Sequence, residues 1–378
     1  MTSSIAPENH GKNGDKCVAG TPQQESNNSN GETNSNRRRV LVVYGSLSSF
    51  VRTDLKVLSA QHSVRELHFR RDGAMLPVSV LKAVAGVIWS DVTISWFGAV
   101  HGLVPFILAR ILRRKCIVIA GGYDSAAVPE IGYGNMRGGI RRRIGLMVFR
   151  LADRVLAFSQ SAAREILANA KVPKEKLRVI ELGIPIPPED PSSPSVVTRH
   201  GAMTVGIVNQ SNLTRKGIAT FVAAARHLPD VPFLVVGRWS DRTVDELKAS
   251  ASRNVEFLDW VPDEVLRQHM RRNSVYVQAS AHEAFGVALA EAMLMGCVPV
   301  VTDRGSLREV AGPDALYVAY GDAQGTATAI KCATTTTTAE VRGRIRNRIV
   351  SRFSVETRQR RLAEQIEQVL QSVSTVRS

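Results

Sequence analysis

Short apolar runs alternate along the chain with stretches of helical periodicity, an order that predicts strands followed by helices. The first run, 40–43, is β-branched and leads into Gly45-Ser46, which is typical of a buried parallel strand and its turn. Repeated strand–helix alternation with short connections predicts a doubly wound α/β layer. The predicted strands of this first series are 63–69, 87–95, 116–120, 154–159 and 177–182, and the predicted helices are 55–61, 78–85, 101–112, 136–152 and 161–170.

A stretch with five prolines between Pro185 and Pro194 predicts a linker, after which a second series begins. Its predicted strands are 203–208, 233–236, 255–258, 275–278 and 298–302, and its predicted helices are 217–226, 244–250 and 287–295. The Thr334–Thr338 run predicts a loop tip. We therefore expect an α/β fold in which two Rossmann-like, doubly wound parallel-sheet domains face a cleft.

Two domains are expected, and the second of them carries the ligand motifs. The first covers residues 37–186 and is completed by a C-terminal helix at about 356–373, the linker covers 187–198, and the second domain covers 199–355. Residues 1–36 are rich in Ser, Asn, Gly and Thr and are predicted to be a disordered tail.

Charge adds an expectation about partners. The net charge is +15, and residues 37–186 hold 24 basic against 10 acidic side chains. This asymmetry favours an anionic partner, either a membrane surface, a nucleic acid or an acidic substrate, and the alternative is a generally basic surface. No zinc-finger, RNA-recognition or helix-turn-helix pattern is present, so nucleic acid is not expected.

The four cysteines are scattered without a CxxC pair, which indicates neither a zinc site nor a disulfide framework. No apolar run is long enough for a transmembrane helix and no signal peptide is evident, so we expect a cytoplasmic protein.

The residues around Glu283 carry the candidate chemistry. Helix 287–295 is apolar on nearly every face and is therefore predicted to be buried, which makes a carboxylate at Glu291 costly unless a hydrogen bond satisfies it. A pair of ligand hydroxyls would supply such bonds. The amides of Phe285, Gly286 and Val287 at the start of this helix are a ready anion site. The alternative is that Glu283 only caps the helix and Glu291 is a paired core charge.

This stretch resembles the sugar-nucleotide motif of the family 4 retaining glycosyltransferases, which have the GT-B fold. The matching residues are Ser280, Glu283, Phe285, Gly286, Glu291, Ala292, Gly296, Pro299, Val300, Gly305 and Glu309. The resemblance implies that Glu291 binds the ribose of the nucleotide and that Glu283 binds the donor sugar. The amides that follow Glu283 would contact sugar and phosphate.

A second match is Arg215-Lys216-Gly217, where the family places a lysine on the diphosphate. A lysine beside a helix N-terminus makes an anion pocket, and the alternative is a solvated basic turn. The family usually has an arginine five residues before that lysine, where this chain has Ser211, so Arg215 is predicted to supply the second positive charge. Gly237 matches the glycine that ends a strand near the nucleotide.

The resemblance is weaker in the first domain. Gly45 and Ser46 stand where the family often has two glycines, and the family's mid-domain histidine has no clear counterpart. We predict that Tyr123 and Asp124 lie on the acceptor side, with Asp124 as the catalytic candidate beside Glu283 and Lys216. His101 is interpreted as structural.

The segment Arg137–Arg150 places Ile140, Ile144, Met147, Val148 and Leu151 on one helix face, flanked by arginines. A basic amphipathic helix of this kind suits an anionic membrane surface, and the alternative is an ordinary surface helix that packs Ile140 and Ile144 inward. In the acceptor-side domain it favours a lipid-linked glycan as acceptor and a peripheral position on the inner face of the plasma membrane.

The resemblance implies a hexosyltransferase that uses a UDP-, GDP- or ADP-sugar as substrate, with retention of configuration, no metal and no cofactor. Such an enzyme would act in the synthesis of a cell-surface polysaccharide or glycolipid. Two alternatives stay open. One is a sugar-nucleotide epimerase of similar architecture, and the other is a non-catalytic glycan- or membrane-binding relative.

Overall fold

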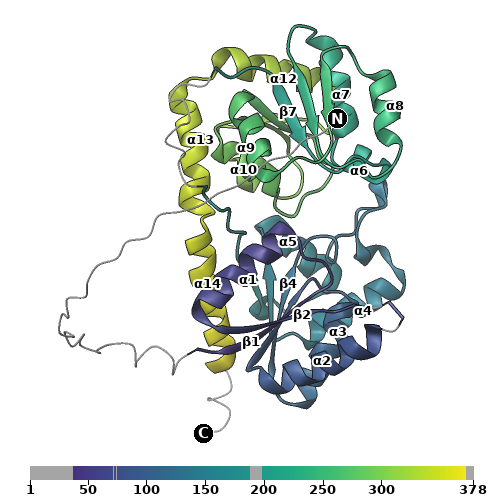
Figure 1. Cartoon of the computed structure of the whole chain (residues 1–378), viewed down its shortest axis with the longest axis vertical. Coiled ribbons are helices and arrows are strands. Elements are labelled where there is room, and N and C mark those ends of the chain that lie inside the picture. The colour runs from purple at the N-terminus through teal and green to yellow at the C-terminus, as the bar shows by residue number, and fades with distance from the viewer. Residues whose placement is uncertain (1–36, 71, 74, 188–197, 372–378) are drawn as a thin grey trace, which may run out of the picture. The chain divides into compact units, whose positions relative to one another are not determined.

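The computed structural model describes residues 37–70, 72–73, 75–187 and 198–371. The predicted tail 1–36 and most of the predicted linker lie outside these residues. Two parallel six-stranded sheets organise the described chain, so the predicted fold class is confirmed (Figure 1). We call the first sheet and its helices the N-lobe and the second sheet and its helices the C-lobe.

The sheet of the N-lobe has the strand order β2-β1-β3-β4-β5-β6. In β1, Val40 and Val42 belong to one apolar cluster and Leu41 and Val43 to another, so both faces of the sheet are buried, as expected for a parallel sheet. The strands are β1 (Arg39–Tyr44), β2 (Ser63–His68), β3 (Val92–Trp96), β4 (Lys115–Ala120), β5 (Arg154–Ala157) and β6 (Leu177–Val179). The helices are α1 (Ser49–Gln61), α2 (Met75–Trp89), α3 (Val100–Ile111), α4 (Gly139–Leu151) and α5 (Gln160–Glu165), the last continuing into a π-helical turn (Ile166–Ala170).

The sheet of the C-lobe has the order β12-β11-β10-β7-β8-β9, the arrangement of a dinucleotide-binding fold. Its strands are β7 (Ala202–Val205), β8 (Phe233–Val236), β9 (Val255–Leu258), β10 (Val275–Gln278), β11 (Val298–Thr302) and β12 (Leu316–Val318). The helices are α6 (Gln210–Arg215), α7 (Ile218–Ala224), α8 (Thr243–Ser250), α9 (Asp263–Arg272), α10 (Val287–Leu294), α11 (Leu307–Ala311), α12 (Ala323–Thr336) and α13 (Ala339–Arg352).

Several predicted boundaries were wrong, and three of them have a clear physical reason. Residues 87–89 finish α2 instead of starting a strand, because Val87 packs into the N-lobe core from the helix. Most of the threonine run belongs to α12, where hydroxyls of Thr334, Thr335 and Thr336 bond back to carbonyls one turn earlier. The basic helix starts at Gly139, because Gly138 before it adopts φ 149°.

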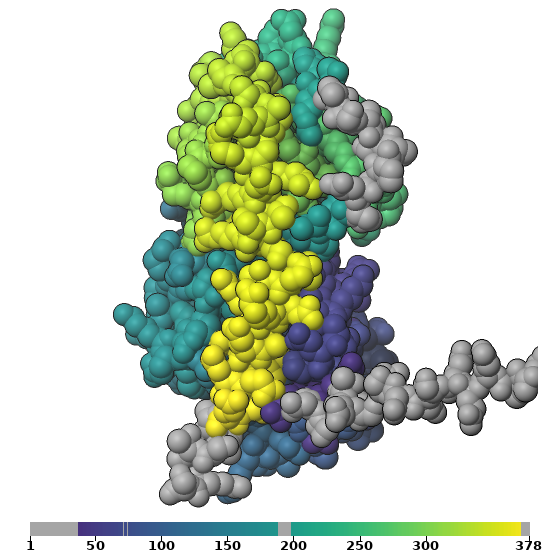
Figure 2. All heavy atoms as spheres, turned by 90° about the vertical axis from the view of Figure 1, so that its left-hand side faces the viewer, coloured from purple at the N-terminus to yellow at the C-terminus, as the bar shows by residue number. Residues whose placement is uncertain are grey.

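The C-terminal helix α14 (Val355–Gln371) lies against α1 of the N-lobe, after α13 has run along the C-lobe (Figures 1 and 2). Its anchor is Arg358, which is 1% exposed. The guanidinium donates from Nε to Asp54 Oδ1 at 2.9 Å and from Nη2 to Asp54 Oδ2 at 2.7 Å. Nη1 donates to the carbonyls of Ile180 and Glu181 at 2.8 and 3.1 Å. One side chain thus ties α14 to α1 and to the segment that follows β6.

No helix among the described residues combines the length and apolar character needed to cross a membrane.

Replacing Arg358 by Met should destabilise the protein by about 3–5 kcal/mol, because Asp54 would remain buried without its cation. The double variant Arg358→Met/Asp54→Leu should recover most of that loss, because no uncompensated charge remains. Urea unfolding followed by tryptophan fluorescence measures both. Equal losses in the single and the double variant would contradict this account of the pair.

Candidate active site

The fold brings two loops of the C-lobe together at one sheet edge. The strand order reverses between β7 and β10, and ligands of such sheets bind in the crevice beyond the strands at that point. Lys216 follows β7, and Glu283 follows β10. Between them, Gly217 adopts φ 69°, and a Cβ atom there would lie 2.0 Å from the carbonyl oxygen of Ala279. Only glycine allows the two loops to approach so closely.

The Glu283 carboxylate is the centre of this site. Its Oε1 forms an ion pair with Lys216 Nζ and accepts hydrogen bonds from Gln278 Nε2 at 2.8 Å and Ser280 Oγ at 3.1 Å. Burial raises the pKa of Glu283, but Lys216 and Arg215 more than offset this, and the pKa falls below its usual value. Glu283 is therefore ionised at neutral pH and faces an ammonium group.

Arg215 adds a second cation at the same place. Its guanidinium bonds Asn212 Oδ1 at 2.6 and 3.2 Å, and its Cζ lies 5.0 Å from the centre of the Tyr133 ring. Ser211, which stands where the family has its arginine, bonds only Asn209 Oδ1 among the described residues, at 3.0 Å. The charge that the sequence predicts from Arg215 is thus within electrostatic reach of Glu283.

The helix that follows presents its first amides without a side-chain cap. α10 begins after Gly286, whose φ is 99°, and no side chain caps its N-terminus. The first amides of a helix have no acceptor within it, so those at the start of α10 are available to an anion. Phe285 has a different task, because its ring is 3% exposed and meets the Phe353 ring edge-on at 5.3 Å.

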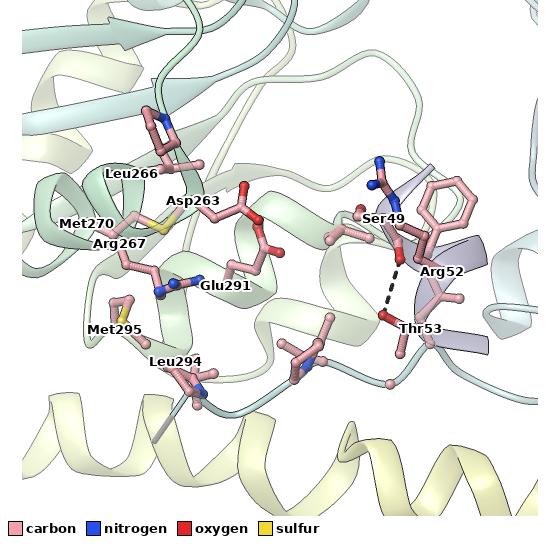
Figure 3. A pocket seen from close by; sticks show the side chains of 18 of the residues that line it. Ser49, Arg52, Thr53, Asp263, Leu266, Arg267, Met270, Glu291, Leu294 and Met295 are labelled. Atoms are coloured by element: carbon pink, nitrogen blue, oxygen red, sulfur yellow. Dashed lines mark hydrogen bonds between the residues drawn. The ribbon is translucent and has the colours of Figure 1, made fainter. Parts of the chain in front are cut away.

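Glu291 on α10 faces a cavity of about 600 Å³. Figure 3 shows its carboxylate beside Asp263 and Arg267 of α9, across from Ser49, Arg52 and Thr53 of α1. Burial, helped by Asp263 and opposed by Arg267, raises the pKa of Glu291 to about 7. Among the described residues its carboxylate has no hydrogen-bond partner. Trp260, 62% exposed, also lines the cavity and offers a large aromatic surface.

Gly237 serves the packing of the sheet edge. It follows β8, and a Cβ atom there would lie 2.0 Å from the carbonyl oxygen of Gly206 at the end of β7. The glycine therefore lets the chain after β8 pass directly beside the chain that leads to Lys216.

Asp124 has a different environment from the one expected. Oδ2 accepts from the Gly98 amide at 2.6 Å and Oδ1 from the Gly121 amide at 2.9 Å. Burial raises the pKa of Asp124 to about 6, although backbone amides bond to it. Both oxygens are engaged by the loops after β3 and β4, and the side chain is 2% exposed. Both oxygens are thus already bonded within the N-lobe, and the catalytic role of Asp124 stays a prediction.

The remaining N-lobe candidates lie on loops at the carboxyl ends of the strands. Gly45 and Ser46 are exposed after β1, and a Cβ atom on Gly45 would lie 3.0 Å from Nδ1 of His101. His101 is 7% exposed and its Nε2 bonds the Trp96 carbonyl, as a structural histidine does. The Tyr123 ring, 40% exposed, meets the Tyr133 ring at 5.0 Å.

Sequence reasoning missed several residues that the fold places next to Glu283. Gln278 ends β10, and its position at the carboxyl end of a strand could have marked it as a site residue. Tyr133 lies between Gly132 and Gly134, and an aromatic residue between two glycines could have marked a loop at the site. Glu165, which bonds His282, carried no signal, because it is one more polar residue on a helix.

No group of three or more His, Cys, Asp or Glu side chains suited to a metal ion occurs in the part of the chain that the structure describes.

Residues 202–336 match the family model of glycosyl transferases group 1. Over 134 residues the chain is 33% identical to a phosphatidyl-myo-inositol mannosyltransferase of Mycolicibacterium smegmatis, which covers 34% of this chain and 35% of that protein. Over 164 residues it is 30% identical to a GDP-mannose:cellobiosyl-diphosphopolyprenol alpha-mannosyltransferase of Xanthomonas oryzae pv. oryzae, which covers 40% of each. The matches thus span between a third and two fifths of these curated relatives.

Among solved structures, HepE of Anabaena in complex with UDP and glucose aligns with a TM-score of 0.71 and 20% identity, over 88% of this chain and all of that one. The sucrose-phosphate synthase of Thermosynechococcus elongatus aligns with a TM-score of 0.68 and 16% identity, over 89% of this chain and 100% of that one. At these identities the likeness shows the fold.

The Glu291→Gln variant should be more stable than the parent protein at pH 8, with a gain on the order of 2 kcal/mol. A raised pKa means that the folded state holds its proton more tightly than the unfolded state, so this group's contribution is lost as the pH rises from about 4.5 to about 7. The difference in melting temperature should therefore be small at pH 5 and reach a plateau above pH 7. Glu246→Gln, at an exposed position of α8, is the control. A pH-independent difference would contradict the assignment.

Proposed function

We propose that this chain, whose residues 202–336 match the family model of group 1 glycosyl transferases, transfers a hexosyl residue from a nucleotide sugar to a glycan or lipid-linked acceptor, with retention of configuration. The observation that carries the proposal is the ion pair of Lys216 and Glu283 at the strand reversal of the C-lobe sheet. Glu291 faces its cavity from the helix that follows the same loop.

The site offers one group for each part of a donor. Lys216, Arg215 and the first amides of α10 would bind the diphosphate, and Glu291 would accept hydrogen bonds from the ribose hydroxyls. Glu283 would accept a hydrogen bond from the sugar. As the nucleoside diphosphate leaves, negative charge grows on its oxygens, and cations already fixed in place stabilise that charge. The acceptor would attack from the face that the diphosphate leaves.

The donor is best sought among mannosyl nucleotides. Two relatives are named mannosyltransferases, and the name of one specifies GDP-mannose, whereas the HepE structure contains UDP. GDP-mannose is therefore the first donor to test, followed by UDP- and ADP-sugars. The same two names include an inositol phospholipid and a diphosphopolyprenol, which supports a lipid-linked acceptor for this chain.

We propose in addition that one surface of the N-lobe faces a membrane, which would suit the same class of acceptor. On α4, Ile140 is 67% and Met147 50% exposed, whereas Val148, which was predicted on the same face, is buried in the N-lobe core. Arg141, Arg142 and Arg143 are exposed beside them. The neighbouring helices α2 and α3 expose Leu81 and Ile111, each at 70% (Figure 1). Apolar side chains among arginines suit an anionic lipid surface.

Lys216→Met should lower kcat by about 100- to 1000-fold, because it removes one fixed positive charge at the leaving group. A thermal-shift screen against GDP-, UDP- and ADP-sugars first identifies the donor, since a ligand of the folded state raises its melting temperature. Transfer to a polyprenyl-diphosphate-linked or phosphatidylinositol acceptor is then measured with that donor. Lys331→Met, on an exposed part of α12, is the control.

Full activity of Lys216→Met would contradict the proposed role of this lysine. Rapid interconversion of donor epimers without acceptor would show an epimerase instead. Binding of donors without any transfer or hydrolysis would show a non-catalytic protein.

The triple variant Arg141→Gln/Arg142→Gln/Arg143→Gln should bind vesicles of equal parts phosphatidylcholine and phosphatidylglycerol roughly 100-fold more weakly, at about 1 kcal/mol per arginine. Cosedimentation measures this binding. A matched triple variant on the C-lobe, Arg242→Gln/Arg253→Gln/Lys331→Gln, should retain it. Equal losses in both variants would mean that net charge alone, and no particular face, governs membrane binding.

A further inference from the structure

The loop that carries Glu283, residues 280–286, is held by the N-lobe as well as by its own sheet. His282, one residue before Glu283, is 4% exposed, and its Nε2 lies 2.8 Å from Oε1 of Glu165 at the end of α5. Ser159, the N-cap of α5, donates from Oγ to the carbonyl oxygen of Ala284 at 2.9 Å. The short helix α5 thus contacts the residue before Glu283 and the residue after it.

Another N-lobe loop touches the same place. Gly122, after β4, adopts φ 102°, and a Cβ atom there would lie 2.4 Å from the Cβ atom of Ala284. The Tyr133 ring lies 5.2 Å from the His282 ring and also packs under the Arg215 guanidinium. The imidazole is therefore enclosed on several sides, with only one polar partner among the described residues.

A second C-lobe helix closes this arrangement into a ring. Ser306, just before α11, donates from its amide at 3.0 Å and from Oγ at 3.1 Å to the Glu283 carbonyl oxygen. Glu309 on α11 accepts from the amides of Gln160 and Ser161 at 2.8 and 2.7 Å, at the start of α5. Hydrogen bonds therefore run from α5 to the loop, from the loop to α11, and from α11 back to α5.

The Glu165–His282 contact is a costly part of this ring to leave unmade. Oε2 of Glu165 and Nδ1 of His282 are buried, and the described residues provide no partner for either. The one bond between the two side chains thus compensates for the desolvation of both. In addition, α5 passes directly after Glu165 into a π-helical turn, a geometry that often marks functional positions.

We propose that Glu165 is a positioning residue: through His282 it fixes the backbone on which Glu283 stands, so that α5 of the N-lobe forms part of the donor site. The inference rests on the proposed function only where it concerns turnover. A carboxylate displaced by about 1 Å loses roughly 100-fold in rate, although the site is otherwise intact. The nucleotide groups, Lys216 and Glu291, do not contact Glu165 and should keep their affinity.

The test compares Glu165→Ala and Glu165→Gln with a control one residue away, Arg164→Gln, on the exposed face of α5. Glu165→Ala should lower kcat by about 10- to 100-fold. The Kd of the nucleoside diphosphate, from calorimetry, should change less than about twofold, because Lys216 and Glu291 hold the nucleotide. Glu165→Gln should recover most of the rate, because an amide oxygen can still accept from Nε2–H of His282. Arg164→Gln should match the parent protein.

Hydrogen exchange gives a readout that needs no turnover. The amides of residues 280–286 should exchange faster in Glu165→Ala and at the parent rate in Arg164→Gln, with protection elsewhere unchanged. If the parent protein transfers no sugar, the proposed function fails, and the exchange result still decides this inference. Unchanged exchange in the loop, an unchanged kcat, or a loss of rate matched by an equal loss of nucleotide affinity would each overturn the positioning role.

Discussion

The ion pair between Lys216 and Glu283 is the constraint on which the rest of the site depends. A carboxylate that is 10% exposed is costly to ionise, and a cation beside it allows the charge to persist. The two partners come from loops after β7 and β10, which are neighbours only because the strand order reverses between those strands. Gly217 is also required, because only a residue without a Cβ atom lets these two loops pass so close to each other. Sheet topology, loop geometry and charge therefore all place Lys216 beside Glu283.

The sequence predicted those parts of the molecule whose cause is local. Short continuous apolar runs and helical stripes predicted both sheets, because the central strands are buried on two faces. The spacing of Glu283, Gly286 and Glu291 predicted a loop, a helix start and an inward carboxylate on α10. Where local signals compete, prediction failed. Residues 87–89 are β-branched or aromatic yet complete α2, because tertiary packing overrides a weak propensity.

Contacts between distant segments could not be predicted in this way. Glu165 and His282 are 117 positions apart, and no local sequence pattern around either residue identifies the other as its partner. Asp124 shows how the folded surroundings add to such a prediction. Its place after a strand is typical of a catalytic acid, but the amides of Gly98 and Gly121 converge on its oxygens only once β3 and β4 are paired. A position beyond a strand locates a site, and only the folded surroundings decide which residues remain free to react.

Two buried charged groups differ in how their charge is compensated. Arg358 and Asp54 satisfy each other fully in the scaffold, where the guanidinium also meets two carbonyls. Glu291 is the opposite case, because its carboxylate is desolvated beside Asp263 and has no hydrogen-bond partner among the described residues. In the proposed function, hydroxyls of the bound nucleotide would offset the cost of this desolvated carboxylate. Substitutions that remove the charge would then stabilise the free fold and weaken nucleotide binding, because the same desolvation would produce both effects.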